Sequence, residues 1–273
     1  MDSQEIYSHV SERYSAAALS SSSGYGDRVA KAFGYSEEEL AAIPRESNLG
    51  LSCGNPLAVA SLRDGETVID LGSGAGLDVF LAASKVGPTG KAIGVDMNKD
   101  MLSKAQKLKA DSGKTNIQFV ESRITEIALE SGIAECIISN CVINLVPENE
   151  KQLVFNEMFR LLKSGGRVAI SDILARKPFP EEIRRSIGLY VGCVAGASQV
   201  ADYERYLKDA GFKDILITDM GSDLNVYLET DADRSGTAES NVCCSAGEGM
   251  LTDLQGQDLN LWAGSFGVYA VKR

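Results

Sequence analysis

Histidine is nearly absent from this chain of 273 residues, in which His9 is the only one. We therefore expect neither a Ser-His-Asp triad nor a metal site built from histidines. Basic side chains are also scarce: 27 lysines and arginines face 38 acidic residues, for a formal net charge of −11. Because such a surface repels phosphate backbones, we expect no nucleic-acid partner.

Long apolar runs are missing as well, since no stretch approaches the roughly eighteen residues needed to span a bilayer. The first residues carry Asp2, Glu5 and Glu12 and no apolar core, which argues against a secretory signal. We therefore expect a cytoplasmic protein with no membrane partner. We also expect it to be a monomer. In a reducing compartment the six cysteines would not serve as disulfides, and a core of this size does not need them.

The most informative feature that is present is an apolar run ending in three alternating glycines, at residues 67–76. Its β-branched residues favour a buried strand. Gly72, Gly74 and Gly76 allow a tight turn and a close approach of the backbone to a ligand. Asp96 ends the next apolar run about twenty residues later, where a carboxylate can accept hydrogen bonds from ribose hydroxyls. Together these features indicate a nucleoside-containing cofactor.

Strand and helix signals alternate along the chain, which predicts an α/β fold with a mostly parallel sheet covered on both faces. The predicted strands are residues 67–71, 91–96, 117–121, 134–140, 166–172, 214–219 and 268–271. The predicted helices are residues 2–17, 78–86, 98–112, 148–163, 180–195 and 199–210. A further helix begins at Ser36, which forms a capping box with Glu39. Gly165 and Gly166 are expected to stop the helix that precedes them.

We divide the chain into four parts. Residues 1–60 form an N-terminal cap, and residues 61–175 form a doubly wound, Rossmann-like domain that binds the cofactor. Residues 176–219 supply lid helices and a sixth strand. Residues 220–273 are a polar excursion that ends in a closing, seventh strand.

Three cysteines are predicted to meet at one edge of this sheet. In an open α/β sheet, ligands bind outside the carboxyl ends of the strands. Cys141 directly follows the fourth strand, next to Asn140. Cys53 precedes the first strand and Cys193 follows the fifth, in segments that can both fold over the same rim. Free cysteine is often only a small buried hydrophobe, which is our interpretation of Cys136 in mid-strand.

The glycine motif, with Asp70 ahead of it, resembles the first motif of class I S-adenosylmethionine methyltransferases. The cysteine segments resemble, more specifically, those of the arsenite methyltransferases. The likeness covers most of residues 36–219 and is carried by the motifs at residues 35–40, 48–56, 70–76, 138–145 and 190–197. The segment Ser-Asn-Cys-Val-Ile-Asn-Leu and the two other cysteine contexts are more specific than the glycine loop.

This resemblance implies a seven-stranded class I methyltransferase fold with S-adenosyl-L-methionine as the cofactor. It implies that Cys53, Cys141 and Cys193 bind trivalent arsenic, a soft centre that thiolates select. Arsenic held by three sulfurs keeps a lone pair that can attack the donor methyl group in line, so no general base is needed. The implied substrate is arsenite or its thiol conjugates, converted to mono-, di- and trimethylated arsenic in detoxification, with thioredoxin or glutathione as the reductant.

The resemblance also implies a set of cofactor contacts. They are Asp70, Gly72, Ser73, Gly74, Gly76, Asp96, Met97, Ile124, Thr125 and Asn140. The chain departs from the family pattern in three places. Serines at 20–23 stand where relatives carry further cysteines, Gly192 stands where some have glutamate, and Thr125 replaces a usual acidic residue.

Two other functions stay open at this point. The chain could methylate a carbon, oxygen or nitrogen acceptor with structural cysteines, or it could bind a metalloid without catalysis. Zinc could also occupy three thiolates, although structural zinc sites usually have four ligands and closer spacing. Cys243 and Cys244, in the polar excursion, are either surface thiols without a fixed role or a capture site that passes As(III) inward.

Overall fold

The computed structural model describes residues 2–19, 24–179, 190, 193, 195–228 and 258–273. The serine run at 20–23, Gly192, Cys243 and Cys244 lie outside these residues, as does most of the predicted helix 180–195. Within the described residues, no helix is both long enough and apolar enough to cross a membrane.

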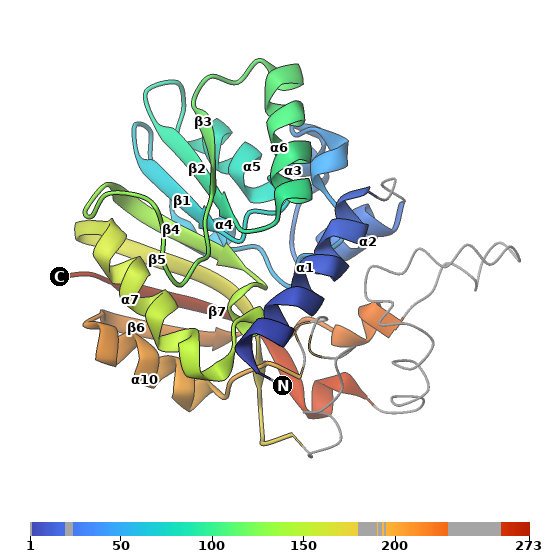
Figure 1. The fold of residues 1–273 in the computed structure, drawn as a ribbon, viewed down its shortest axis with the longest axis vertical. Helices are drawn as coiled ribbons and strands as arrows, with labels where there is room; N and C mark the ends of the chain where they lie inside the picture. The colour runs from blue at the N-terminus through green and yellow to red at the C-terminus, as the bar shows by residue number, and fades with distance from the viewer. Residues whose placement is uncertain (1, 20–23, 180–189, 191–192, 194, 229–257) are drawn as a thin grey trace, which may run out of the picture.

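The described residues form a seven-stranded sheet in the order β3-β2-β1-β4-β5-β7-β6 (Figure 1). Only β7 runs antiparallel to its neighbours, which confirms the predicted doubly wound, mostly parallel sheet. The strands are β1 (Thr67–Leu71), β2 (Lys91–Asp96), β3 (Ile117–Glu121), β4 (Ala134–Asn140), β5 (Leu162–Ala175), β6 (Lys213–Asp219) and β7 (Ala263–Val271). The strand order reverses between β1 and β4, the place where such sheets bind ligands.

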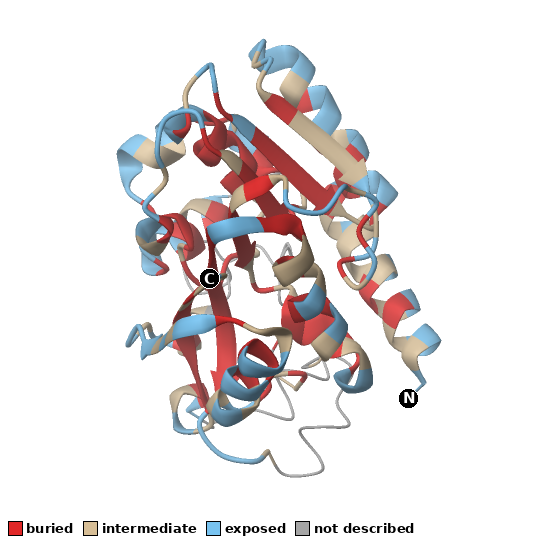
Figure 2. Ribbon diagram, turned by 90° about the vertical axis from the view of Figure 1, so that its left-hand side faces the viewer, coloured by how far each residue is buried: buried red, intermediate tan, exposed pale blue. Residues whose placement is uncertain are grey.

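Helices cover both faces of the sheet. The α-helices of the described residues are α1 (Ser3–Leu19), α2 (Gly24–Ala32), α3 (Glu37–Ala41), α4 (Leu57–Ala60), α5 (Leu77–Lys85), α6 (Lys99–Ser112), α7 (Lys151–Leu161) and α10 (Val200–Ala210). Alternate strand residues point to opposite faces, so α4, α5 and α6 share one apolar cluster with the sheet and α7 and α10 share another. Figure 2 shows the result, with buried strands between helices whose outer sides are exposed.

Two local predictions have clear outcomes. The capping box of Ser36 and Glu39 is confirmed at the start of α3. The prediction that Gly165 and Gly166 stop a helix is wrong, because α7 ends at Leu161 and the glycines lie inside β5. Their backbone pairs with Lys272, beyond β7, and this pairing makes the segment a strand. The helices α2 and α4 were not predicted.

Helix α1 lies across the carboxyl edge of the sheet. Asn98, the N-cap of α6, donates from its side-chain amide to the carbonyl of Ser11 and to Ser15 Oγ, each at 3.0 Å. Lys104 Nζ donates to the carbonyl of Ala18 at 2.9 Å. These contacts hold α1 against α6 and over the turn that follows β1 (Figure 1).

A buried ion pair joins the start of β1 to β5. The Arg167 guanidinium donates to both carboxylate oxygens of Glu66, at 2.9 and 2.8 Å, and to the carbonyls of Ala60 and Ser61. Each side chain of the pair is 10% exposed. Removing one partner would leave the other charge desolvated and uncompensated.

We therefore expect Glu66→Ala to lower the free energy of unfolding by about 3 kcal/mol, measured by urea denaturation. The matched control is Glu204→Ala, which breaks an exposed pair with Lys208 on α10 and should change stability little. An effect of Glu66→Ala no larger than that of the control would contradict this role for the pair.

Candidate functional site

A cavity lies at the carboxyl ends of β1, β2 and β4. Its lining includes eight of the ten residues predicted to contact a cofactor: Asp70, Gly72, Ser73, Gly74, Asp96, Met97, Ile124 and Asn140. The other two, Gly76 and Thr125, are not among the lining residues. Gly76 has φ +97° as the N-cap of α5, and a Cβ there would meet the ring of Phe119 at 3.0 Å, so packing alone accounts for it.

The glycine turn after β1 is fixed by Asp96. Gly74, at φ +52°, donates its N–H to Asp96 Oδ2 at 2.8 Å, while Asn98 N donates to Asp96 Oδ1. Gly72, at φ +72°, has no room for a side chain, because a Cβ would lie 2.4 Å from Val142 Cγ2. The predicted carboxylate therefore stands at the end of β2 as expected, and it also organises the turn.

Ser73 leaves a polar atom available to a ligand. Its side chain is buried, and among the described residues its Oγ has no hydrogen-bond partner. Buried polar atoms are rarely left unpaired without a functional reason. Because Ser73 lines the cavity between two glycines, a bound polar group can satisfy it.

Three carboxyl groups line the cavity, those of Asp70, Asp78 and Asp96. Burial raises the pKa of Asp70 well above its ordinary value, and the nearby Asp78 and Asp96 carboxylates raise it further. Burial raises the pKa of Asp78 to about 6, against hydrogen bonds from Tyr35 and Asn140 that lower it. Burial also raises the pKa of Asp96. The cavity therefore suits a ligand that brings positive charge of its own.

The raised pKa of Asp78 predicts a pH-dependent stability. In the unfolded chain an aspartate has a pKa near 3.9. The stability that the protonated Asp78 carboxyl contributes is therefore fully present below about pH 4 and is lost as the pH rises through 6. The asparagine of Asp78→Asn cannot ionise. The free energy of unfolding of this variant, relative to that of the unmodified protein, should therefore rise by roughly 2–3 kcal/mol between pH 4 and pH 7.5. Urea denaturation across this range measures the difference. Asp111→Asn, on the exposed side of α6, controls for loss of one carboxylate. A difference that stays constant with pH would contradict the prediction.

Helix α1 supplies one wall of the cavity that was not predicted. Tyr7, Val10, Ser11 and Tyr14 line it from successive turns of the helix. Their spacing is that of one helical face, so the sequence carried the signal. The Tyr14 hydroxyl also lies 3.9 Å from Cys193 Sγ, so this face reaches from the cavity to the cysteines.

The structure brings Cys53, Cys141 and Cys193 into one buried apolar cluster at the same edge of the sheet. Cys193 Sγ donates to the carbonyl of Cys141 at 2.9 Å. Cys141 follows β4 and also lines the cavity, so the cysteine cluster and the cavity adjoin. Cys141 and Cys193 adopt positive φ angles of +59° and +65°. Residues other than glycine rarely adopt this backbone conformation, and those that do are concentrated at functional sites.

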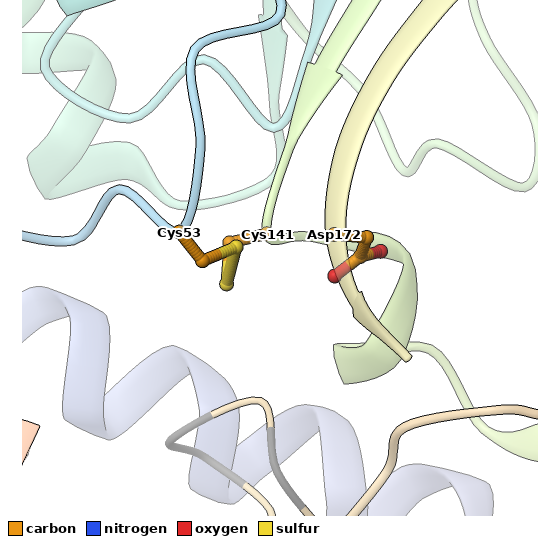
Figure 3. Close-up of side chains that lie close together, drawn as sticks. All are labelled: Cys53, Cys141 and Asp172. Carbon is orange, nitrogen blue, oxygen red and sulfur yellow. A yellow bond between two sulfur atoms is a disulfide. The ribbon is translucent and has the colours of Figure 1, made fainter. Parts of the chain in front are cut away.

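Cys53 and Cys141 are joined by a disulfide (Figure 3). The expectation that the cysteines form no disulfide is therefore wrong for this pair. Asn140 holds the segment of Cys53 close to Cys141. Its Oδ1 accepts from Cys53 N at 3.2 Å, and its Nδ2 donates to the carbonyl of Gly54 at 2.9 Å. These bonds set the two cysteine Cα atoms 5.6 Å apart, within reach of a disulfide.

Asp172 on β5 is a site residue that sequence reasoning missed. It is fully buried, and one of its oxygens lies within 4.8 Å of the sulfurs of both Cys53 and Cys141 (Figure 3). Tyr203 donates its hydroxyl to Oδ2 at 2.5 Å, and Asn144 donates its side-chain amide to Oδ1 at 2.8 Å. Burial raises the pKa of Asp172 to about 7. The available signal was an acid at the end of the predicted strand 166–172, close to the edge of the sheet where ligands bind.

The segment that carries Cys193 is anchored by two buried polar side chains. Lys151, which is 1% exposed, donates to the carbonyl of Gly196 at 2.6 Å and to Ser198 Oγ at 2.7 Å. Asn144 donates to the carbonyl of Cys193 at 3.3 Å. These bonds position the third cysteine over the edge of β4.

Cys136 lies apart from this cluster. It is fully buried on the face covered by α4 and α5, and burial raises the pKa of its thiol to about 12. A neutral thiol in that setting packs as a small apolar side chain, in keeping with the interpretation drawn from the sequence.

Residues 62–211, more than half of the chain, match the family model described as a methyltransferase domain. The chain belongs to this methyltransferase family. It is also 39% identical, over 251 residues, to the arsenite methyltransferase of Halobacterium salinarum, which confirms the resemblance noted in the sequence. That match covers 85% of this chain and 64% of the relative, so the chain spans less than two thirds of the relative's length.

Solved structures support the fold of this methyltransferase. An arsenic(III) S-adenosylmethionine methyltransferase from Chlamydomonas reinhardtii matches with a TM-score of 0.60 and 24% identity, over 93% of this chain and 75% of that one. A Haemonchus contortus phosphoethanolamine N-methyltransferase, solved with S-adenosyl-L-methionine, matches with a TM-score of 0.62 and 19% identity, over 80% and 52%. At these identities the likeness establishes the class I fold.

Proposed function

We propose that this chain is an S-adenosyl-L-methionine-dependent methyltransferase that acts on trivalent arsenic. The observation that carries the proposal is the position of three buried cysteines beside the cavity at the switch point of the sheet. The 39% identity to an arsenite methyltransferase supports it. The proposed substrate is arsenite or its thiol conjugates, and the products are mono-, di- and trimethylated arsenic, as in detoxification.

The cavity has the features that S-adenosyl-L-methionine requires. Its carboxylates Asp70, Asp78 and Asp96 offer counter-charge to a sulfonium and an ammonium group, and the glycine turn leaves room for close approach. Asp96 stands where a ribose is expected, Ser73 offers a hydroxyl after β1, and Asn140 lines the cavity at the end of β4. When bound, this cofactor supplies an electrophilic methyl group.

The cysteine cluster suits a soft substrate. Thiolates of Cys53, Cys141 and Cys193 would hold As(III) as a pyramid whose lone pair is free to react. No side chain then has to remove a proton to create the nucleophile, in keeping with a chain that has a single histidine. The apolar residues around the cysteines exclude water, so the protein contributes mainly by positioning two reactants.

The disulfide between Cys53 and Cys141 must open before arsenic can bind. Two thiol equivalents reduce it, yielding two cysteine thiols and one external disulfide. We propose thioredoxin or glutathione as the physiological donor of these electrons. The cytoplasm provides such a reducing environment, and we propose that the protein acts there as a monomer.

Replacing single cysteines tests the proposal. Incubation of reduced protein with arsenite, labelled methyl donor and thiol, followed by separation of the arsenic species, should yield labelled methylarsenicals. Cys141→Ser or Cys193→Ser should abolish methylation and leave cofactor binding intact, because arsenic loses its fixed pyramid. Cys53→Ser should keep methylation of monomethylated arsenic, which needs only two protein sulfurs.

Cys136→Ser is the matched control, since this buried cysteine lies away from the cluster. Unmodified protein that binds the cofactor but yields no methylarsenical would overturn the proposal. Turnover of another acceptor that survives all three cluster substitutions would instead favour a carbon, oxygen or nitrogen methyltransferase with structural cysteines.

Asp96 tests the placement of the cofactor separately. Asp96→Ala removes an acceptor for ribose hydroxyls and the bond that fixes Gly74. We expect it to weaken S-adenosyl-L-methionine binding by roughly 1.5–3 kcal/mol, about ten- to a hundredfold in Kd, measured by calorimetry. Asp111→Ala on α6 serves as the control. An unchanged Kd would show that the ribose does not bind at the end of β2.

A further inference from the structure

The carboxylate of Asp172 lies beside the cysteines, and the proposed binding of arsenic by three sulfurs does not use it. As(III) bound to three sulfurs is complete as a pyramid, and its lone pair occupies the remaining direction. Asp172 nevertheless presents an oxygen within 4.8 Å of both Cys53 Sγ and Cys141 Sγ. Figure 3 shows its carboxylate on β5, beside the paired sulfurs.

Asp172 is held in place by its own hydrogen bonds. Tyr203 donates to one oxygen, and Asn144 and the backbone N–H of Ile173 donate to the other, at 2.5, 2.8 and 2.9 Å. The backbone N–H of Ile143 also donates to this carboxylate and lowers its pKa. A carboxylate has about four acceptor positions, so a bound metal would take the place of one of these donors. Metal-binding carboxylates are commonly oriented by hydrogen bonds of this kind.

Cys53, Cys141 and Asp172 are the residues whose ligand atoms lie within 4.8 Å of one another, and Cys193 is the candidate for a fourth ligand. Its Sγ donates to the carbonyl oxygen of Cys141 at 2.9 Å in the same buried cluster, and it would turn away from that oxygen to reach a metal. After reduction of the disulfide, three thiols and one carboxylate would converge from the segment before β1, the end of β4, the end of β5 and the segment that follows it. Four ligands of this type are the usual requirement of zinc, which is tetrahedral and takes sulfur at about 2.3 Å and carboxylate oxygen at about 2.0–2.2 Å.

We propose that the reduced protein binds one Zn²⁺ through Cys53, Cys141, Cys193 and Asp172. Reduction consumes two external thiols and releases their disulfide, and each cysteine then loses its proton to solvent as the metal binds. Zinc would occupy the sulfurs that arsenic needs, so the two would exclude each other. Zinc occupancy would also keep Cys53 and Cys141 from reoxidising.

The decisive experiment uses the full chain, reduced and kept free of oxygen, with neither arsenite nor methyl donor present. Zn²⁺ is titrated in competition with a chromophoric chelator, and Co²⁺ is substituted to report coordination through its visible spectrum. We expect one equivalent of Zn²⁺ and a tetrahedral Co²⁺ spectrum with sulfur-to-metal charge-transfer bands.

Asp172→Asn removes the anionic oxygen and keeps the side-chain shape. It should lower zinc affinity at least tenfold and alter the Co²⁺ spectrum while the sulfur bands remain. Cys53→Ser should weaken both the binding and the sulfur bands. Cys136→Ser, whose buried thiol lies outside the cluster, should bind zinc as the unmodified protein does. Circular dichroism of each variant verifies folding.

Absence of stoichiometric zinc binding by the reduced protein would overturn the proposal. Undiminished affinity and an unchanged Co²⁺ spectrum in a folded Asp172→Asn variant would also overturn it, since the carboxylate would then not be a ligand. Because neither arsenic nor methyl donor is present, these outcomes are independent of the proposed methylation. One additional measurement rests on the proposed function, because it requires arsenic to bind the same cysteines. In that measurement arsenite should displace the bound zinc in a one-to-one ratio.

Discussion

The site depends on the side-chain amide of Asn140 at the end of β4. Its Oδ1 accepts from the backbone of Cys53, and its Nδ2 donates to the carbonyl of Gly54, so the segment before β1 is held against the sheet. The same Nδ2 lies 3.0 Å from Asp78 Oδ2, within the carboxylate wall of the cavity. One amide therefore places Cys53 beside Cys141 and places both beside the cavity.

This arrangement creates two adjoining environments of opposite character. One environment is the cavity, where carboxyl groups whose pKa is raised by burial suit a cationic ligand. In the other, the cysteines lie in an apolar cluster with α1 and α2, where thiolates would meet little water. Cys141 and Val142 belong to both, because they line the cavity and pack in the cluster. A soft nucleophile and a charged electrophile can thus be held next to each other while each keeps a favourable environment.

Much of the fold could be predicted from the sequence, because β1 to β4 are apolar runs that end at glycine or polar residues. The start of β5 could not be, since two glycines that usually end a helix pair here with Lys272, a contact remote in sequence. The three cysteines were found through the resemblance of their flanking motifs. Their disulfide was missed because spacing along the chain does not reveal the distance that Asn140 imposes. Asp172 and the cavity-lining face of α1 had signals in the sequence, and only the structure shows that they lie beside the cysteines and the cavity.

Arsenic K-edge X-ray absorption of the reduced protein with one equivalent of arsenite tests the central claim most directly, because it counts the atoms bound to the metalloid. We predict three sulfur neighbours for the unmodified protein and two after Cys193→Ser. Fewer than three sulfurs in the unmodified protein, or a count that does not change with the substitution, would contradict the convergence of Cys53, Cys141 and Cys193 on one arsenic atom.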